Sequence, residues 1–236
     1  MEGVFPQVVF RIGEIPIRDT VISTWVMMAL IIALVAILRR LFPDTLQTLV
    51  KTLRDMISGM MGRPTASYLP FLGTLAIFIA VANVLGALPS IPIPAFLIPG
   101  STEGRMIPVV SPTHDVNVPI ALAIIVLFAV HYFGIKEKGG WTYFKDLISP
   151  IFLAPLTIPL EVLSELSRTL SLSVRLFGNI ISTDLIVAVI FSLVSWIAPL
   201  PFVGFSFFTG LLQAYIFTTL SAIYIAGAVE SSEVDV

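Results

Sequence analysis

The chain has 236 residues, of which 57% are hydrophobic and only 12% are charged, and its mean hydropathy is +1.00. One soluble core of this length would not use so much apolar surface, so most of it is expected to face lipid. The net charge of −2 does not indicate a nucleic-acid partner. Because the sequence contains no cysteine, it offers no disulfide, thiolate metal site or thiol nucleophile.

Five segments are long and apolar enough to cross a bilayer as helices, each close to or above the roughly 20 residues that a span needs. The first twenty residues lack the pattern of a signal peptide, so the chain is expected to begin at its mature end. We predict an all-α integral membrane protein with one membrane domain over residues 1–236. The transmembrane helices are expected at residues 21–40, 69–88, 116–135, 150–198 and 202–229.

Two segments between the spans have other signatures. Residues 44–62 place leucine, isoleucine and methionine at helical spacing, with Lys51, Arg54 and Asp55 between them. This pattern predicts an amphipathic helix on the membrane surface. Residues 89–115 contain too many prolines for a helix and are predicted to form an outward loop.

Orientation follows from the bias of lysine and arginine toward cytoplasmic loops. If the spans alternate in direction, one side of the membrane carries eight basic residues and the other carries three. The sequence therefore predicts an outward N-terminus and a cytoplasmic tail at residues 230–236. The cytoplasmic group is Arg39, Arg40, Lys51, Arg54, Arg63, Lys136, Lys138 and Lys145, and the outward group is Arg11, Arg18 and Arg105.

The fourth span carries ionisable groups at depths where a bilayer disfavours them. Polar residues recur three and four residues apart, which places them within about 80° on a helical wheel. An arginine at the centre of a membrane helix costs about 2.5 to 3.5 kcal/mol of insertion free energy, so this stripe is expected to face protein or water. The stripe consists of Glu161, Glu165, Arg168, Arg175 and Asn179, with Leu172 on the same face.

Part of this stripe has a purely structural alternative. Glu165 and Arg168 could neutralise each other, and Glu161 could lie among lipid headgroups. Arg175 does not fit that alternative, because Asp184 is nine residues further and about 180° away on the wheel. Its partner is expected on another subunit.

The residues around Arg175 resemble a known family signature. Leu170 to Asn179, LSLSVRLFGN, is similar to the S-L-R-L-F-G-N pattern of the a subunit of F-type ATP synthases, with valine in place of a common leucine. Three further motifs follow the family's order. They are Val81 to Gly86, VANVLG; Pro112 to Asn117, PTHDVN; and Leu212 to Phe217, LQAYIF.

The resemblance implies a role for each matching residue. Arg175 would be the stator charge facing the rotor ring, Gln213 its polar neighbour on the last helix, and Glu161 part of the cytoplasmic half-channel. Asn179, Asp184, Asn83 and Asp115 would lie near the outward half-channel. Ser206 stands where some members have histidine, and Asp184 where glutamate or histidine is common, so the outward relay is expected to differ. Further candidates are Glu165, Arg168, Ser206 and Tyr224.

Two residues have ordinary structural explanations as well. Gln213 could be a hydrogen-bonding contact between apolar helices. His131 lies late in the third span, and a lone helical histidine is as often a packed side chain as a relay group, so it is not included among the candidates.

The function implied by the resemblance is that of a stator subunit, which couples H⁺ or Na⁺ flow through two half-channels to ring rotation and ATP synthesis. Its partners would be a ring of c subunits, peripheral-stalk b subunits and the remaining ATP synthase subunits, in a bacterial inner membrane. No catalytic site, cofactor or metal is expected on this chain.

Rival classes find less support in the sequence. Gly134 to Gly140 is the nearest approach to a P-loop, but Trp141 stands where the phosphate-binding lysine should be. The principal alternative is an autonomous ion-coupled transporter or channel. Such folds often contain two related halves, and no internal repeat is evident in this sequence.

Overall fold

The computed structural model describes residues 8–12, 14–62, 66–87, 91–94, 106–109, 111–148, 154–193 and 200–230. Five of its helices are long and apolar enough to cross a membrane, which confirms the predicted fold class. They are α1 (Asp19–Leu41), α3 (Leu69–Ala87), α4 (Asn117–Lys138), α6 (Ala154–Leu193) and α7 (Leu200–Val229).

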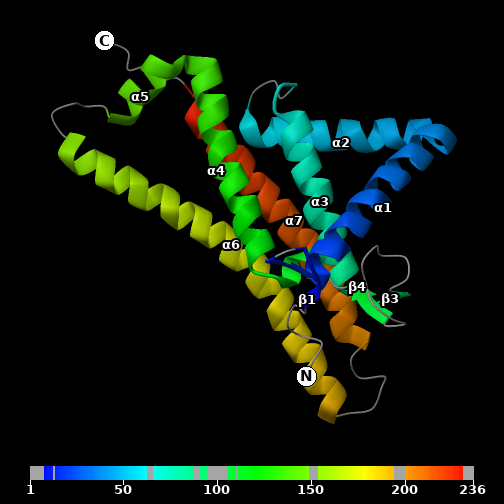
Figure 1. Cartoon of the computed structure of the whole chain (residues 1–236). Coiled ribbons are helices and arrows are strands. Elements are labelled where there is room, and N and C mark those ends of the chain that lie inside the picture. Colours follow the sequence, from blue (N-terminus) through cyan, green and yellow to red (C-terminus); the bar gives the residue numbers. More distant parts are fainter. Residues whose placement is uncertain are drawn as a thin grey trace.

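The amphipathic segment forms helix α2 (Pro43–Met61), which follows α1 after a sharp change of direction (Figure 1). Pro43 stands at the start of α2, where a proline is tolerated because the first amides of a helix have no internal partner. Gly62 ends the helix in the left-handed conformation, with φ of 64°, which glycine adopts at little cost. A short helix, α5 (Gly140–Ile148), follows α4 and was not predicted.

Two antiparallel hairpins were also missed by the sequence analysis. Strands β1 (Val8–Ile12) and β2 (Ile15–Arg18) precede α1, and β3 (Ile91–Pro94) pairs with β4 (Met106–Val109) inside the expected loop. Pro92 lies opposite Pro108 in the second hairpin. Both strands of a two-stranded ribbon are edges, and an edge strand tolerates the missing amide donor of proline. The proline content therefore excludes a helix there but does not exclude strands.

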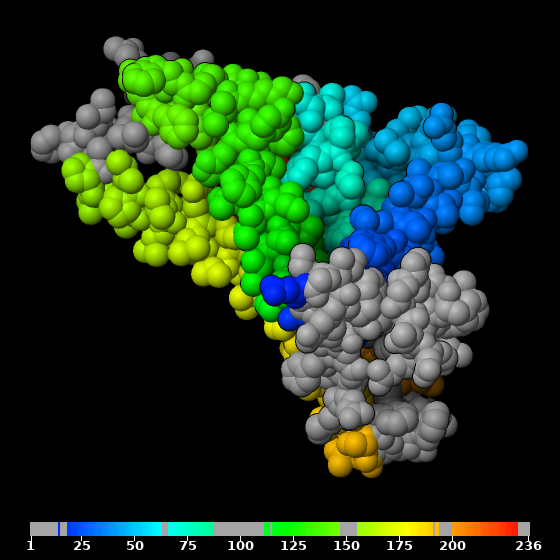
Figure 2. Space-filling view, viewed as in Figure 1, coloured from blue at the N-terminus to red at the C-terminus, as the bar shows by residue number. Residues whose placement is uncertain are grey.

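Helices α3, α4 and α7 form the centre of the bundle, and α6 runs obliquely along one side of it (Figure 1). In the space-filling view the first half of α6, coloured yellow-green, forms one edge of the molecule (Figure 2). Only 17% of the most apolar part of α1, and the same share of α6, is buried within the chain. Their remaining apolar surface is available to lipid or to other subunits.

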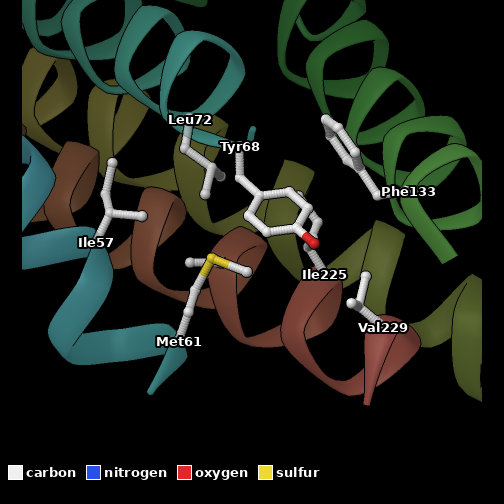
Figure 3. Close-up of a cluster of buried hydrophobic side chains, with 8 residues drawn as sticks. Ile57, Met61, Tyr68, Leu72, Phe133, Ile225 and Val229 are labelled. Carbon is white, nitrogen blue, oxygen red and sulfur yellow. The ribbon is translucent and has the colours of Figure 1, made fainter. Parts of the chain in front are cut away.

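One apolar cluster joins α2 to the bundle. Ile57 and Met61 of α2 meet Leu72 of α3, Phe133 of α4 and Ile225 of α7 (Figure 3). The ring of Tyr68 packs edge-on against Phe133 at 5.0 Å between centroids, and its hydroxyl donates to Glu137 Oε1 at 3.1 Å. A second cluster, containing Leu172 and Leu176 of α6 with Ala214 and Phe217 of α7, fixes α6 against the bundle.

Candidate functional site

The polar stripe of α6 lies at the border between its packed and exposed faces. Leu172 and Leu176 are buried against α7, whereas Arg175 between them is exposed. Glu161, Glu165 and Asn179 are partly buried, and Arg168 is exposed. Packing by the two leucines thus fixes the rotation of α6 and presents the guanidinium of Arg175 on the surface of the chain.

Arg175 has no ion-pair partner among the residues that the structure describes, where ion pairs involve Arg18, His131 and Lys138 instead. Asp184 makes an interaction of its own and is partly buried. A guanidinium is charged under all protein conditions. The exposed face around Arg175 therefore carries a fixed positive charge in the middle of a long apolar helix.

Asn83 lies at the contact between α3 and α7, and Gln213 follows Gly210 by three residues on α7. Asn83 Nδ2 donates to the carbonyl oxygen of Gly210 at 2.8 Å, and a Cβ built on Gly210 would lie 2.9 Å from Asn83 Cβ. Both amide side chains are buried, and Asn83 Oδ1 and Gln213 Nε2 have no hydrogen-bond partner within the described part of the chain. Each such buried polar atom costs about 1 to 3 kcal/mol unless it finds a partner.

Asp115 is the centre of a hydrogen-bonded cluster at the start of α4. Its Oδ2 accepts from Arg18 Nη1 at 2.9 Å and from the hydroxyl of Thr20 at 3.4 Å. Its Oδ1 accepts from the backbone amide of Asn117 at 3.1 Å and from Asn117 Nδ2 at 2.7 Å. The carboxylate thus ties α1 to the beginning of α4. Its expected role in ion translocation remains a prediction.

The other expected outward residues lie along α6 and α7. The hydroxyl of Thr183 donates a hydrogen bond to the backbone oxygen of Asn179 at 2.9 Å. The side-chain amide of Asn179 takes no part in this bond. Ser206 accepts from the Thr209 hydroxyl in the same way at 3.1 Å. Both residues are partly buried, and their expected roles likewise remain predictions.

A second group of polar side chains gathers where α4, α5, α6 and α7 meet. Glu165 Oε1 lies 3.2 Å from His131 Nε2, and the guanidinium of Arg168 lies 5.4 Å from the ring centre of Tyr224. Glu161, Glu165, Arg168, Tyr143 and Tyr224 line a pocket of about 420 Å³. The described residues include no ion pair between Glu165 and Arg168, so the direct neutralisation that the sequence left open is not found there.

His131 is the polar residue that the sequence analysis left out. His131 belongs to α4, an apolar helix without a polar face, so the spacing of polar residues does not predict which side chain it contacts. The available signal was its place about four turns along α4, which runs antiparallel to α6 and brings it to the level of Glu165.

Comparison with known proteins supports the resemblance seen in the motifs. Residues 21–226 match the family described as ATP synthase A chain. The chain is 38% identical over 230 residues to ATP synthase subunit a 2 of Bradyrhizobium sp. (strain BTAi1), which covers 94% of this chain and 93% of that protein.

Two further relatives are similar over almost their whole length. ATP synthase subunit a 1 of Hahella chejuensis is 36% identical, with 98% of this chain and 92% of that protein covered. ATP synthase subunit a of Legionella pneumophila (strain Philadelphia 1) is 34% identical, with 98% and 95% covered. The motif around Arg175, the five apolar helices and these full-length matches agree, and the chain belongs to the ATP synthase A chain family.

Proposed function

We propose that this chain is the stator subunit that leads ions to and from a rotating ring in the membrane sector of an ATP synthase, with Arg175 as the charge that faces the ring. Membership of the family makes it a non-catalytic subunit of the ATP synthase complex and does not favour an autonomous transporter. The single observation that carries the proposal is the exposed guanidinium of Arg175, which has no ion-pair partner among the described residues.

The energetics of a bilayer explain why that observation matters. An exposed arginine in the middle of a membrane helix costs at least about 2.5 kcal/mol if it faces lipid alone. A carboxylate on a neighbouring subunit would remove this penalty by pairing with it. The apolar surface of α6 around Arg175 includes Val174, which is exposed, and this surface suits contact with apolar helices of a ring.

The mechanism follows from the permanence of the charge. A ring carboxylate that carries an ion is neutral and can travel through lipid, whereas near Arg175 its ionised form is stabilised. The ion is therefore released as the carboxylate approaches Arg175, and a new ion is taken up after it passes. If the two access paths do not join, an ion crosses only by travelling with the ring, and each ion moved down 100 mV delivers about 2.3 kcal/mol.

The two polar groups of the site lie on either side of Arg175 along the bundle and suit two separate access paths. Glu161, Glu165 and the pocket beside them belong to the end where Arg39, Arg40 and α5 lie, and we assign this end to the cytoplasm (Figure 1). Asn83 and Asp115 belong to the end with the hairpins, which we assign to the outside. The partially unsatisfied amides of Asn83 and Gln213 favour water or an ion as their partner there.

The partners proposed for the chain are a ring of c subunits along α6 and α7, and peripheral-stalk b subunits together with the remaining ATP synthase subunits. The proposed location is a bacterial inner membrane, with H⁺ as the ion, and Na⁺ as the alternative to be tested by its effect on transport. The direct test replaces Arg175 with alanine in the complete complex, and loss of gradient-driven ATP synthesis is the expected result.

Replacing Glu161 with alanine is expected to slow ion transfer on the cytoplasmic side while the complex still assembles. Glu161 lines the pocket and is only partly buried, so its loss removes a carboxylate from the path without opening the core. Coupled ATP synthesis should fall about tenfold. This loss is smaller than the roughly 100-fold that a positioned acid–base group contributes at the low end. The matched control is Glu230→Ala, an exposed acid beyond α7. Normal coupled rates in Glu161→Ala would rule out a channel role for this carboxylate.

Replacing Gln213 with leucine is expected to weaken coupling severalfold without abolishing it, because the charge of Arg175 remains. Leucine has similar bulk but no donor or acceptor. If Gln213 were a structural contact between helices, the change would lose about 0.6 kcal/mol of stability. Since Gln213 Nε2 is buried and has no hydrogen-bond partner among the described residues, stability should instead be kept or increased. Thermal unfolding of the complex separates the two roles, with Gln47→Leu, at an exposed position of α2, as control.

A further inference from the structure

His131 of α4 and Glu165 of α6 form a pair that the motifs of the family did not indicate. His131 Nε2 lies 3.2 Å from Glu165 Oε1, and the side chains are 30% and 22% exposed. The other ring nitrogen, Nδ1, lies 3.1 Å from the backbone oxygen of Leu127. Along α6, Glu165 precedes Arg175 by ten residues, or about 15 Å. The pair therefore lies between the proposed cytoplasmic end and the stator charge.

The two contacts of the imidazole determine how many protons the pair holds. A backbone oxygen can only accept, so Nδ1 carries a proton and donates it to Leu127. Nε2 and Oε1 are then within hydrogen-bonding distance only if one proton lies between them. It belongs either to an imidazolium facing a carboxylate or to a carboxylic acid facing a neutral imidazole. Without this proton, the lone pair of His131 Nε2 would face the negative charge of the Glu165 carboxylate.

The groups around the pair come from every helix packed against it. From α5, the ring of Tyr143 lies 6.0 Å from the imidazole, centre to centre. Burial, and after it the carboxylates of Glu165 and Glu161, raise the pKa of Tyr143, so its hydroxyl stays protonated at neutral pH. From α6 and α7, Arg168 and Tyr224 complete the wall of the pocket, together with Glu161.

Two of the other charged groups at this end of α4 have partners of their own. Glu137 accepts from the hydroxyl of Tyr68 at 3.1 Å, and Lys138 pairs with Asp146 of α5 at 3.3 Å. Glu165 is thus the acid paired with His131, and it is also a wall of the 420 Å³ pocket. One side of Glu165 faces the imidazole, and the other is accessible to the pocket.

We propose that His131 and Glu165 act together as a one-proton carrier in the cytoplasmic half-channel, so that the ion conducted there is H⁺. This inference rests on the proposed function, since it needs an ion path through α6. Histidine is the side chain whose charge changes nearest neutral pH, and an imidazole beside a carboxylate can pass a proton without moving either helix.

The step is a proton transfer that leaves every other bond intact. The proton between Nε2 and Oε1 moves to the carboxylate of Glu165 and leaves through the pocket to water, after which the pair carries one negative charge. A proton from water on the channel side then restores the pair. Transfer in the opposite direction reverses the same steps. A sodium ion does not take the place of this proton, because the 3.2 Å between Nε2 and Oε1 is a hydrogen-bond distance and leaves room between the two atoms for a proton only.

The experiment measures passive H⁺ flux through the membrane sector, reconstituted with its ring in vesicles, while the pH on the cytoplasmic face is varied from about 5 to 8. His131→Gln keeps a polar side chain but cannot carry the proton. We expect its flux to fall at least about tenfold, which is below the roughly 100-fold that a positioned acid–base group can contribute. Its flux should also respond less to the pH of the cytoplasmic face than the flux of the unchanged protein does.

His114→Gln is the matched control, since the chain has two histidines and this one ends the short 3-10 turn Pro112–His114 that precedes α4. Wild-type flux and pH dependence are expected for it. In His131→Ala, imidazole added on the cytoplasmic side should restore flux, whereas imidazole added on the other side should not. This restoration cannot come from a structural role. It also keeps the test valid if His131→Gln assembles poorly.

Three results would overturn the proposal. They are unchanged flux and pH dependence in His131→Gln, no restoration by imidazole in His131→Ala, and flux that requires Na⁺. The proposed function is tested separately, because its failure would appear as ATP synthesis that survives replacement of Arg175. If ATP synthesis is lost when Arg175 is replaced but H⁺ flux is unchanged when His131 is replaced, only the proposed proton carrier is rejected.

Discussion

Replacing Arg175 with alanine is expected to abolish ATP synthesis driven by an ion gradient. Without a fixed cation, an approaching ring carboxylate has no partner, and a charged carboxylate in low dielectric is disfavoured, so it keeps its ion. The fold should survive, because Arg175 is exposed and the leucines beside it still pack against α7. Insertion should be easier by about 2.5 to 3.5 kcal/mol.

The measurement reconstitutes the assembled Arg175→Ala complex in vesicles, imposes a gradient and follows ATP formation together with passive flux. Arg54→Ala, an exposed arginine of α2 outside the stripe, should retain full synthesis. If the guanidinium also separates the two access paths, the mutant vesicles should leak ions faster than vesicles that lack the ring. Substantial synthesis by Arg175→Ala would contradict the mechanism, whereas lost synthesis without added leak would remove only the separating role.

The second large effect is expected at Gly210, where α7 packs tightly against α3. A Cβ at this position would lie 2.9 Å from Asn83 Cβ, close to the rigid backbone of α3. Gly210→Ala should therefore push the helices apart, weaken the bond from Asn83 to the Gly210 oxygen, and destabilise the protein by about 1 to 3 kcal/mol. Reduced thermal stability and impaired assembly with the ring would both report this change.

Gly204 supplies the control on the same helix, because a Cβ there would meet nothing within 4 Å. Alanine is preferred over glycine in a helix by about 1 kcal/mol, so Gly204→Ala should be neutral or stabilising. The opposite signs of the two substitutions distinguish close packing from helix propensity. Equal stability of the two variants would show that α3 and α7 are not in close contact at Gly210.

The sequence predicted the helices well because length and hydropathy determine which segments can cross a bilayer. The charges between the apolar residues of α2 likewise predicted an amphipathic helix, and the polar stripe of α6 was visible from spacing alone. In both cases the pattern contrasts polar with apolar residues along one element. The same reasoning missed β3 and β4, because the prolines were taken to exclude a helix and the segment was then predicted to be a loop.

What the sequence could not provide is the rotation of the helices that are apolar on every side. Helices α3, α4 and α7 have no polar face, so nothing in their periodicity determines which residue meets which neighbour. The pairing of His131 with Glu165 and the contact of Asn83 with Gly210 depend on that rotation. In a membrane, close fit of small residues and interhelical hydrogen bonds set it, rather than burial of an apolar face.

The bond between Asn83 and Gly210 also has a consequence for biosynthesis. The two residues are separated by 127 positions, so α3 enters the membrane well before its partner has been translated. At about 5 to 20 residues per second, this interval lasts on the order of 6 to 25 s. During that time the amide of Asn83 must be held by water, by the insertion machinery or by another segment, because lipid offers it no partner. The nascent chain is therefore most vulnerable to quality-control proteolysis in the interval before α7 arrives.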